Sequence, residues 1–196
     1  TCDIQFGTVE RSLAKNTSWD KARFEVCAHK FVDYSEADYG VAVMNDCKYG
    51  YSLEYKNMSL TLLKCATSPN ENADKGKHYF KYAIYPHIGD YAQSDVGKVS
   101  LQYNNPIFIV SKNTLVKEIK DASLVKTDSD NIVIEAVKCS EDGAGFIVRA
   151  VEEKCKRTVA TFEFMQEIVS AMECDLMENV IDVFKFNGNK LIVDFK

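Results

Sequence analysis

The sequence predicts an all-β protein, built as an antiparallel β-sandwich. Apolar and polar side chains alternate with a period of two along most of the chain, whereas a helix would repeat them every 3.6 residues. Roughly ten such segments recur at spacings of about 8–15 residues. Turn signals separate them, the strongest being Asn187-Gly188 between two apolar runs. Regularly spaced short strands with turns between them are typical of a sandwich.

In the N-terminal half, we expect strands at residues 22–29, 39–44, 49–55, 58–66 and 77–85. The first strand is expected because Ala22, Phe24 and Val26 alternate with polar neighbours. Residues 67–77 are rich in Asn, Asp, Lys and Gly, so they are expected to form a polar loop. Pro86 is expected to end the strand before it.

In the C-terminal half, we expect strands at residues 107–110, 131–139, 145–151, 158–165, 181–186 and 190–195. Ser140-Glu141-Asp142-Gly143 predicts a hairpin turn, because glycine adopts a positive φ easily. Residues 95–103 and 166–172 are each expected to form one or two helical turns.

Size and composition indicate an ordinary globular chain. It has 196 residues, of which 46% are hydrophobic and 27% charged. A chain of this size can bury about 70% of its surface on folding. No stretch approaches the roughly 18 apolar residues of a membrane helix. We expect one domain over residues 1–196, with a subdivision near 125–130 into residues 1–127 and 128–196. Because the chain begins with Thr1, it is expected to be processed or part of a longer protein.

Charge and cysteine content bear on partners and compartment. The 24 basic and 29 acidic residues give a formal net charge of −5, and no basic patch is evident. Nucleic acid and anionic membranes are therefore disfavoured as partners. The seven cysteines contain no C-x-x-C motif, and most have apolar neighbours in the sequence. We expect reduced, buried thiols in a cytoplasmic protein.

No self-contained catalytic motif is found in the sequence. The three histidines lack the spacing that would place two imidazoles on one face of a strand or helix. The chain has neither a G-x-S-x-G motif nor a glycine-rich phosphate loop. Carboxylates are too numerous for a catalytic pair to be chosen by spacing alone.

Polar clusters at strand ends are the candidate functional residues. They lie in segments 16–20, 45–50, 73–78 and 85–90, each with a turn-forming residue. Loops at the ends of a rigid sandwich often carry binding groups, although simple turn chemistry would explain the same residues. The candidates for substrate binding or interface contact are Asp46, Lys48, Tyr49, Asp74, Lys75, His78, His87 and Asp90.

The same segments, taken in order, resemble the C-terminal region of family 38 α-mannosidases, in their cytosolic and vacuolar branch. The resemblance rests on blocks that span nearly the whole chain, among them Asn16-Thr17-Ser18-Trp19-Asp20, Asn45-Asp46-Cys47-Lys48-Tyr49-Gly50, Ala73-Asp74, Pro86-His87 and Glu141-Asp142-Gly143.

This resemblance implies an accessory domain of the galactose-mutarotase-like supersandwich kind, inactive by itself. The family resemblance further implies a retaining exo-glycosidase that acts on α-mannosides. In such an enzyme, zinc and an aspartate nucleophile would lie in an N-terminal catalytic domain. No cofactor is therefore expected in this chain. The implied partners are a catalytic domain on the same polypeptide and mannose-containing oligosaccharides, with homo-oligomerisation left open. The alternatives are a free carbohydrate-binding module and a purely structural or oligomerising domain.

Overall fold

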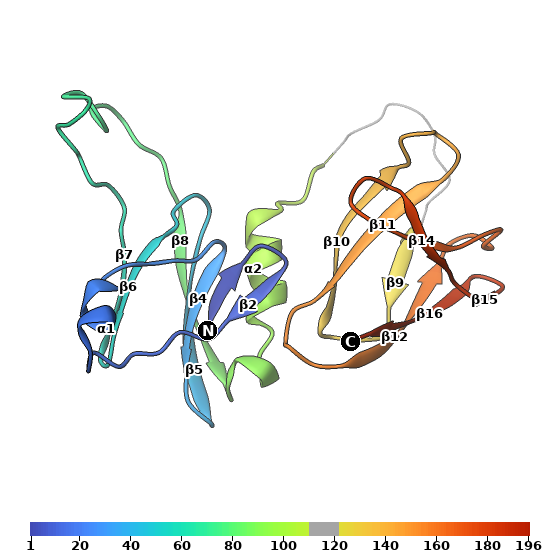
Figure 1. The fold of residues 1–196 in the computed structure, drawn as a ribbon, viewed down its shortest axis with the longest axis horizontal. Coiled ribbons are helices and arrows are strands. Elements are labelled where there is room, and N and C mark those ends of the chain that lie inside the picture. Colours follow the sequence, from blue (N-terminus) through green and yellow to red (C-terminus); the bar gives the residue numbers. More distant parts are fainter. Residues whose placement is uncertain (110–121) are drawn as a thin grey trace. The chain divides into compact units, whose positions relative to one another are not determined.

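The structure is a computed structural model that describes residues 1–109 and 122–196. The chain divides into two compact units, Thr1–Ile107 and Phe108–Lys196 (Figure 1). The subdivision predicted near residues 125–130 stays a prediction, and strand pairing assigns Val125–Thr127 to the second unit.

Two antiparallel sheets form the first unit. The larger contains five strands in the order β2 (Gly7–Val9), β1 (Cys2–Ile4), β4 (Phe31–Ser35), β5 (Tyr39–Asn45) and β8 (Tyr82–Ile88). The smaller contains β3 (Val26–Cys27), β6 (Gly50–Glu54) and β7 (Asn57–Leu60).

Alternating side chains let the five-stranded sheet pack on both faces. On one face, Val32 and Val43 pack with Tyr51 of the three-stranded sheet. On the other, Phe31 and Met44 pack against the 3-10 helix η1 (Tyr91–Gln93) and the helix α2 (Val96–Asn104). The sheet is therefore the middle layer of this unit.

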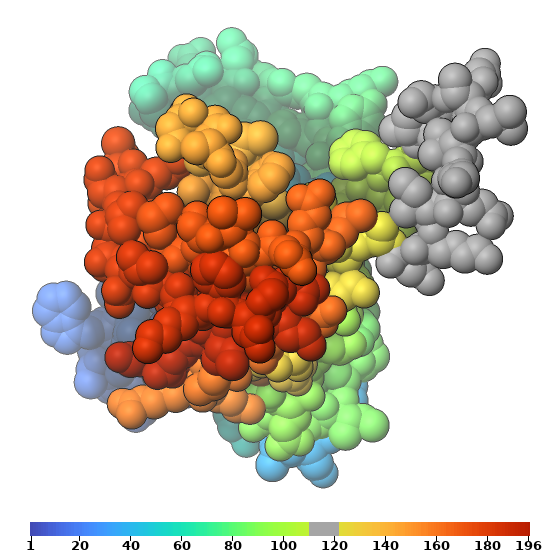
Figure 2. All heavy atoms as spheres, turned by 90° about the vertical axis from the view of Figure 1, so that its right-hand side faces the viewer, coloured from blue at the N-terminus to red at the C-terminus, as the bar shows by residue number. Residues whose placement is uncertain are grey.

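The second unit is also a small antiparallel β structure. A four-stranded sheet has the order β15 (Phe186–Asn187), β16 (Lys190–Phe195), β12 (Thr158–Phe164) and β9 (Val125–Thr127). Two hairpins accompany it, β10 (Ile132–Cys139) with β11 (Phe146–Glu152) and β13 (Met172–Cys174) with β14 (Val180–Val183). Val125, Ile132, Ala160 and Phe162 form its core. Figure 2 draws the atoms of this unit in yellow to red.

The structure confirms the predicted all-β sandwich and its hairpins. Gly143 has a φ of 70° in the β10–β11 connection, and Gly188 has a φ of 60° between β15 and β16. The helix predicted over residues 95–103 is present as α2.

The strand predicted over residues 22–29 is mostly wrong. A short helix, α1 (Ser18–Ala22), comes first, and only Val26–Cys27 pair as β3. Thr17 and Asp20 form a capping box, in which each side chain accepts a hydrogen bond from the other residue's backbone. This local bonding outweighs the alternating pattern at the start of the segment.

Pro86 does not end the strand predicted at residues 77–85, because it lies inside the observed strand β8. Its missing N–H is tolerated because β8 is at the edge of the sheet and pairs only with β5. The same strand begins at Tyr82, not at residue 77, and β7 ends at Leu60. The polar segment between them is therefore longer than predicted.

The helix predicted over residues 166–172 is absent. The Ile168 N–H donates to the Gly188 carbonyl, and the neighbouring Met165 N–H donates to the Leu124 carbonyl. These long-range bonds take the place of helical ones. Residues 107–109 form no strand, and position 110 lies outside the described residues. The short strands β1, β2, β4, β9 and β13 were not predicted.

Candidate functional site

Within the first unit, residues 61–81 extend away from the sheets after β7 and return to the start of β8, and we call this segment the arm (Figure 1). Its outgoing end is fastened to the sandwich. The Thr61 N–H donates to the Gly50 carbonyl at 2.8 Å, and its hydroxyl donates to Glu25 Oε1. Lys64 Nζ lies 2.8 Å from Glu25 Oε2. Beyond this point the arm is mostly exposed.

Two predicted site residues brace the returning end of the arm. Asp46 Oδ1 accepts a 2.9 Å hydrogen bond from the Lys81 N–H, and the Asp46 N–H donates to the Lys81 carbonyl at 3.2 Å. The Lys81 N–H favours the carboxylate and so lowers the pKa of Asp46. Lys48 Nζ lies 5.2 Å from the centre of the Phe80 ring, a cation–π contact. Asp46 and Lys48 thus hold the arm where it rejoins the sheet.

The buried residue Asn45 shapes the loop that presents these two side chains. Its Oδ1 accepts from the N–H groups of Cys47 and Lys48, and its Nδ2 donates to the His29 carbonyl at 2.9 Å. Nδ2 also donates to the Tyr51 hydroxyl. Burial raises the pKa of Tyr51 to about 12. The sequence analysis placed Asn45 in the candidate segment 45–50 but did not select it as a site residue, although an amide that interrupts an apolar run was the available signal.

Three further predicted site residues lie together at the tip of the arm. Asp74 has a φ of 59°, and its Oδ2 accepts a 2.9 Å hydrogen bond from the Cys65 N–H. His78 Nε2 lies 2.8 Å from the Asp74 carbonyl oxygen. Lys75 Nζ donates to Asn72 Oδ1 at 2.9 Å. The tip therefore holds its shape through its own hydrogen bonds while its side chains stay exposed.

His87 lies near the opposite end of β8, apart from the arm. Its Nε2 is 2.7 Å from Asp33 Oδ1, and both side chains are buried. Ser35 Oγ donates to Asp33 Oδ2 at 2.6 Å. Asp33 is a second residue that the sequence analysis missed, because β4 was not predicted as a strand. Asp90 caps η1 by accepting from the Gln93 N–H at 3.0 Å.

The structure thus separates the predicted site residues into distinct places. The register of β5 and β8 sets Tyr82 opposite Asn45 and His87 opposite Gly40, so the arm base and His87 lie toward opposite ends of this ladder. Tyr49 lies with the arm-base loop, and its ring centre is 5.2 Å from that of His29 in an edge-to-face arrangement. The assignment of these residues to substrate binding stays a prediction.

Within residues 1–109 and 122–196, no group of three or more His, Cys, Asp or Glu side chains is placed to hold a metal ion. No helix in that part of the chain is long and apolar enough to cross a membrane.

The seven cysteines all lie in the described residues, and none forms a disulfide. The expectation of buried thiols holds for Cys2 alone, where burial raises the thiol pKa. Cys174 is half-buried, and the remaining five are exposed: Cys27, Cys47, Cys65, Cys139 and Cys155. Short strands and turns at the surface, not core positions, carry most of them.

Comparison with known families places the chain among glycosyl hydrolase C-terminal regions. Residues 1–72 match the model of the glycosyl hydrolases family 38 C-terminal domain. Residues 131–196 match the model of the family 38 C-terminal beta sandwich domain. The matches lie in the first and second units, respectively, and together they cover more than half of the chain.

Curated relatives agree with this family. The chain is 38% identical to alpha-mannosidase G of Dictyostelium discoideum, over 99% of this chain and 19% of that protein. It is 42% identical to an alpha-mannosidase of Saccharomyces cerevisiae, over 71% of this chain and 13% of that protein. Human alpha-mannosidase 2C1 is 34% identical, over 91% of this chain and 17% of its own length. The chain thus spans less than a fifth of each of these relatives.

The two β units and the family matches define a β-sandwich region of a glycosyl hydrolase. The chain belongs to glycosyl hydrolase family 38, as part of its C-terminal region.

Proposed function

We propose that this chain is the C-terminal accessory region of a retaining exo-α-mannosidase. In this proposal it supports a catalytic domain on the same polypeptide, and the tip of its arm contributes to the pocket for mannose-containing oligosaccharides. The names and greater lengths of the relatives support the activity and the existence of a further part. The retaining mechanism is part of the proposal because the family resemblance implies it.

The arm is the observation that carries the proposal. A long segment that buries little of its own surface gains almost no stability from hydrophobic contact. Its base is nevertheless fastened on both sides, by Glu25 and by Asp46, and its tip is ordered around Asp74. Such preorganisation lowers the entropy lost when polar groups engage a ligand or a neighbouring domain. An arm braced in this way is suited to reach beyond its own domain.

An uncovered face of β8, the strand that follows the arm, supports the part of the proposal that concerns a neighbouring domain. Ile84 and Ile88 lie on the same face of this edge strand and are 69% and 86% exposed. Apolar side chains left open to water along an edge strand are typical of a surface that another domain covers. We assign this face to contact with the remainder of the polypeptide.

The proposed location is the cytoplasm. Five exposed thiols without disulfide partners support a reducing compartment, because an oxidising one favours disulfide formation.

The proposal predicts that charge changes at the tip slow turnover without unfolding the protein. In the polypeptide that joins this chain to its catalytic part, Asp74→Asn and Lys75→Met should each lower kcat/KM for an α-mannoside by about tenfold. Asparagine retains an oxygen that can accept from the Cys65 N–H, so the Asp74→Asn variant tests the charge and leaves the turn. The measurement is cleavage of an aryl α-mannoside together with the melting temperature.

The matched control is Glu71→Gln, an exposed change on the same arm with no predicted role. It should leave kcat/KM unchanged. The 196-residue chain alone should leave the aryl mannoside intact, even with added zinc. Metal-dependent turnover by the isolated chain, or unchanged kcat/KM in both tip variants, would contradict the proposal.

A further inference from the structure

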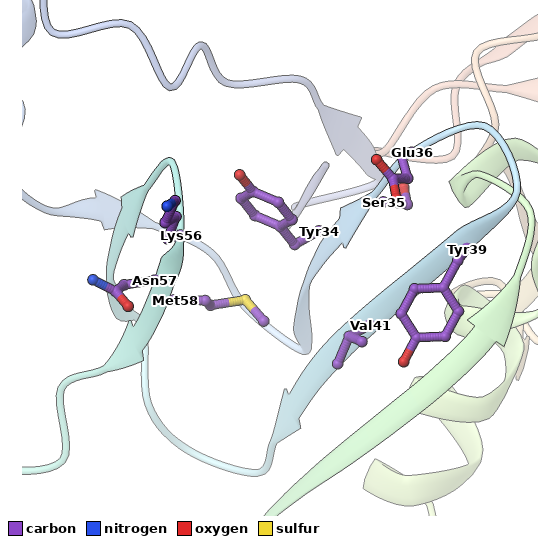
Figure 3. Close-up of a pocket in the computed structure, with 8 residues that line it drawn as sticks. All are labelled: Tyr34, Ser35, Glu36, Tyr39, Val41, Lys56, Asn57 and Met58. Atoms are coloured by element: carbon purple, nitrogen blue, oxygen red, sulfur yellow. The ribbon is translucent and has the colours of Figure 1, made fainter.

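A cleft of about 310 Å³ opens in the first unit where the three-stranded sheet stops covering the five-stranded one (Figure 3). Its floor comes from β4 and β5, and its side wall comes from the start of β7 and the turn before it. Ligand pockets generally enclose about 300–1,000 Å³, so this cleft has room for a small ligand. None of the residues predicted from the sequence as site residues lines it.

The floor is aromatic and apolar. Tyr34 and Val41 are directly opposite one another in the β4–β5 ladder, and Tyr39 lies on the same face of β5 as Val41. Met58 of β7 points toward them from the facing wall (Figure 3). The Tyr34 hydroxyl donates to the Tyr55 carbonyl at 2.7 Å. This bond joins the two sheets beside the cleft, so the Tyr34 ring is held in place before any ligand arrives.

The rim carries polar groups of opposite charge. Glu36 follows β4, Lys56 lies in the β6–β7 turn, and Asn57 is the first residue of β7. All three side chains are exposed, and none has a side-chain hydrogen bond or ion pair with another residue in the described part of the chain. A carboxylate, an ammonium and an amide together offer both donors and acceptors without a large net charge.

We propose that this cleft binds a neutral oligosaccharide, as a site separate from the arm. Tyrosine side chains combine a broad apolar face with a polar tip, which suits the CH faces and hydroxyls of a sugar. The Glu36 carboxylate and the Lys56 ammonium offset each other, so the rim gives a phosphate or another anion little net attraction, and a purely apolar ligand would strip water from the rim groups without replacing their hydrogen bonds. The choice of an α-mannoside as the sugar rests on the proposed function. The assignment of the cleft as a sugar site rests on its own geometry and lining residues.

The test is a titration of the 196-residue chain with α-mannobiose, followed by backbone amide chemical shifts. Saturable shifts are expected in residues 34–41 and 56–58. Tyr39→Ala removes a half-exposed ring and should weaken binding at least about tenfold. Lys56→Met changes an exposed turn position away from the sheet and gives a second variant that should also weaken binding.

Tyr79→Ala is the matched control, because it removes a tyrosine that is 88% exposed on the arm. It should bind α-mannobiose like the unmodified chain. The proposal is overturned by absence of saturable shifts, by shifts outside the cleft, or by unchanged affinity in both cleft variants. Because this assay measures binding without a catalytic part, its failure is distinct from unchanged turnover in the arm variants.

Discussion

Position 40 shows how a single missing side chain makes room for a buried polar cluster. A Cβ added to Gly40 would lie 2.3 Å from His87 Cε1, 2.4 Å from His87 Nε2 and 2.6 Å from Ser35 Cβ. These groups surround Asp33, which His87 and Ser35 both contact through hydrogen bonds. A buried carboxylate needs such partners, because removing it from water is costly. Glycine is therefore required here for space, not for an unusual φ.

Gly40→Ala should consequently destabilise the first unit. The added methyl must displace the imidazole from Asp33, and overpacking of this kind typically costs about 1–3 kcal/mol. Urea unfolding followed by circular dichroism measures the change in the free energy of unfolding. Gly145→Ala is the matched control, since its added Cβ meets nothing within 4 Å. Equal midpoints for the two variants would show that the His87 pocket can relax.

At the scale of an element, α1 exists because of its cap. Asp20 Oδ2 accepts from the Thr17 hydroxyl at 2.8 Å and from the Thr17 N–H at 3.0 Å, and Arg23 Nη2 lies 2.6 Å from Asp20 Oδ1. The hydrogen bonds from Thr17, followed by that from Arg23, lower the pKa of Asp20 to about 2. A five-residue helix has few internal bonds, so its cap decides whether it forms.

The helix should therefore respond to acid. The pKa of an aspartate in an unfolded chain is about 3.9, and the pKa of Asp20 in the folded chain is lower. The ionised carboxylate therefore contributes its full stabilisation of α1 above about pH 4. This stabilisation should disappear as the pH falls from about 4 through about 2. Carboxyl chemical shifts of Asp20 measure the pKa. In Thr17→Ala the pKa should rise toward its ordinary value, and an unchanged pKa would refute the capping explanation.

Over the whole molecule, the two units have separate cores and share an unusual distribution of thiols. The core of the first unit includes Cys2, whereas the core of the second contains no cysteine among its buried residues. The remaining thiols are at or near the surface. The rate at which a reagent modifies the Cys2 thiol therefore reports on unfolding of the first unit.

Alkylation of the native chain with iodoacetamide at neutral pH should separate these thiols. Mass spectrometry should show early modification at the exposed positions, namely Cys27, Cys47, Cys65, Cys139 and Cys155. Cys2 should stay unmodified until the chain unfolds, because it is buried and its raised pKa disfavours the reactive thiolate. The same reaction in urea should modify all seven. Modification of native Cys2 as fast as Cys65 would show that its core site opens readily.

Some parts of this structure could be predicted because they depend on neighbours in the sequence. Asn187-Gly188 specifies its own turn, and the period of two in residues 131–139 and 145–151 predicts a paired hairpin. The capping box at Thr17 and Asp20 was also readable, yet the alternating pattern beside it led to a wrong strand. Where the capping box and the alternating pattern conflict, the hydrogen bonds of the cap determine the local structure.

The sequence alone determined the all-β class, the main hairpins and the family, since alternation, turn residues and motif blocks are local properties. Only the tertiary structure decided which polar groups meet. His87 and Asp33 are 54 residues apart, and Asp46 and Lys81 are 35 apart, so strand register brings each pair together. Register also decided that Pro86 could remain in an edge strand and that residues 61–81 form an arm. The candidate site residues stay a prediction from the sequence, and only the tertiary structure separated them into distinct places.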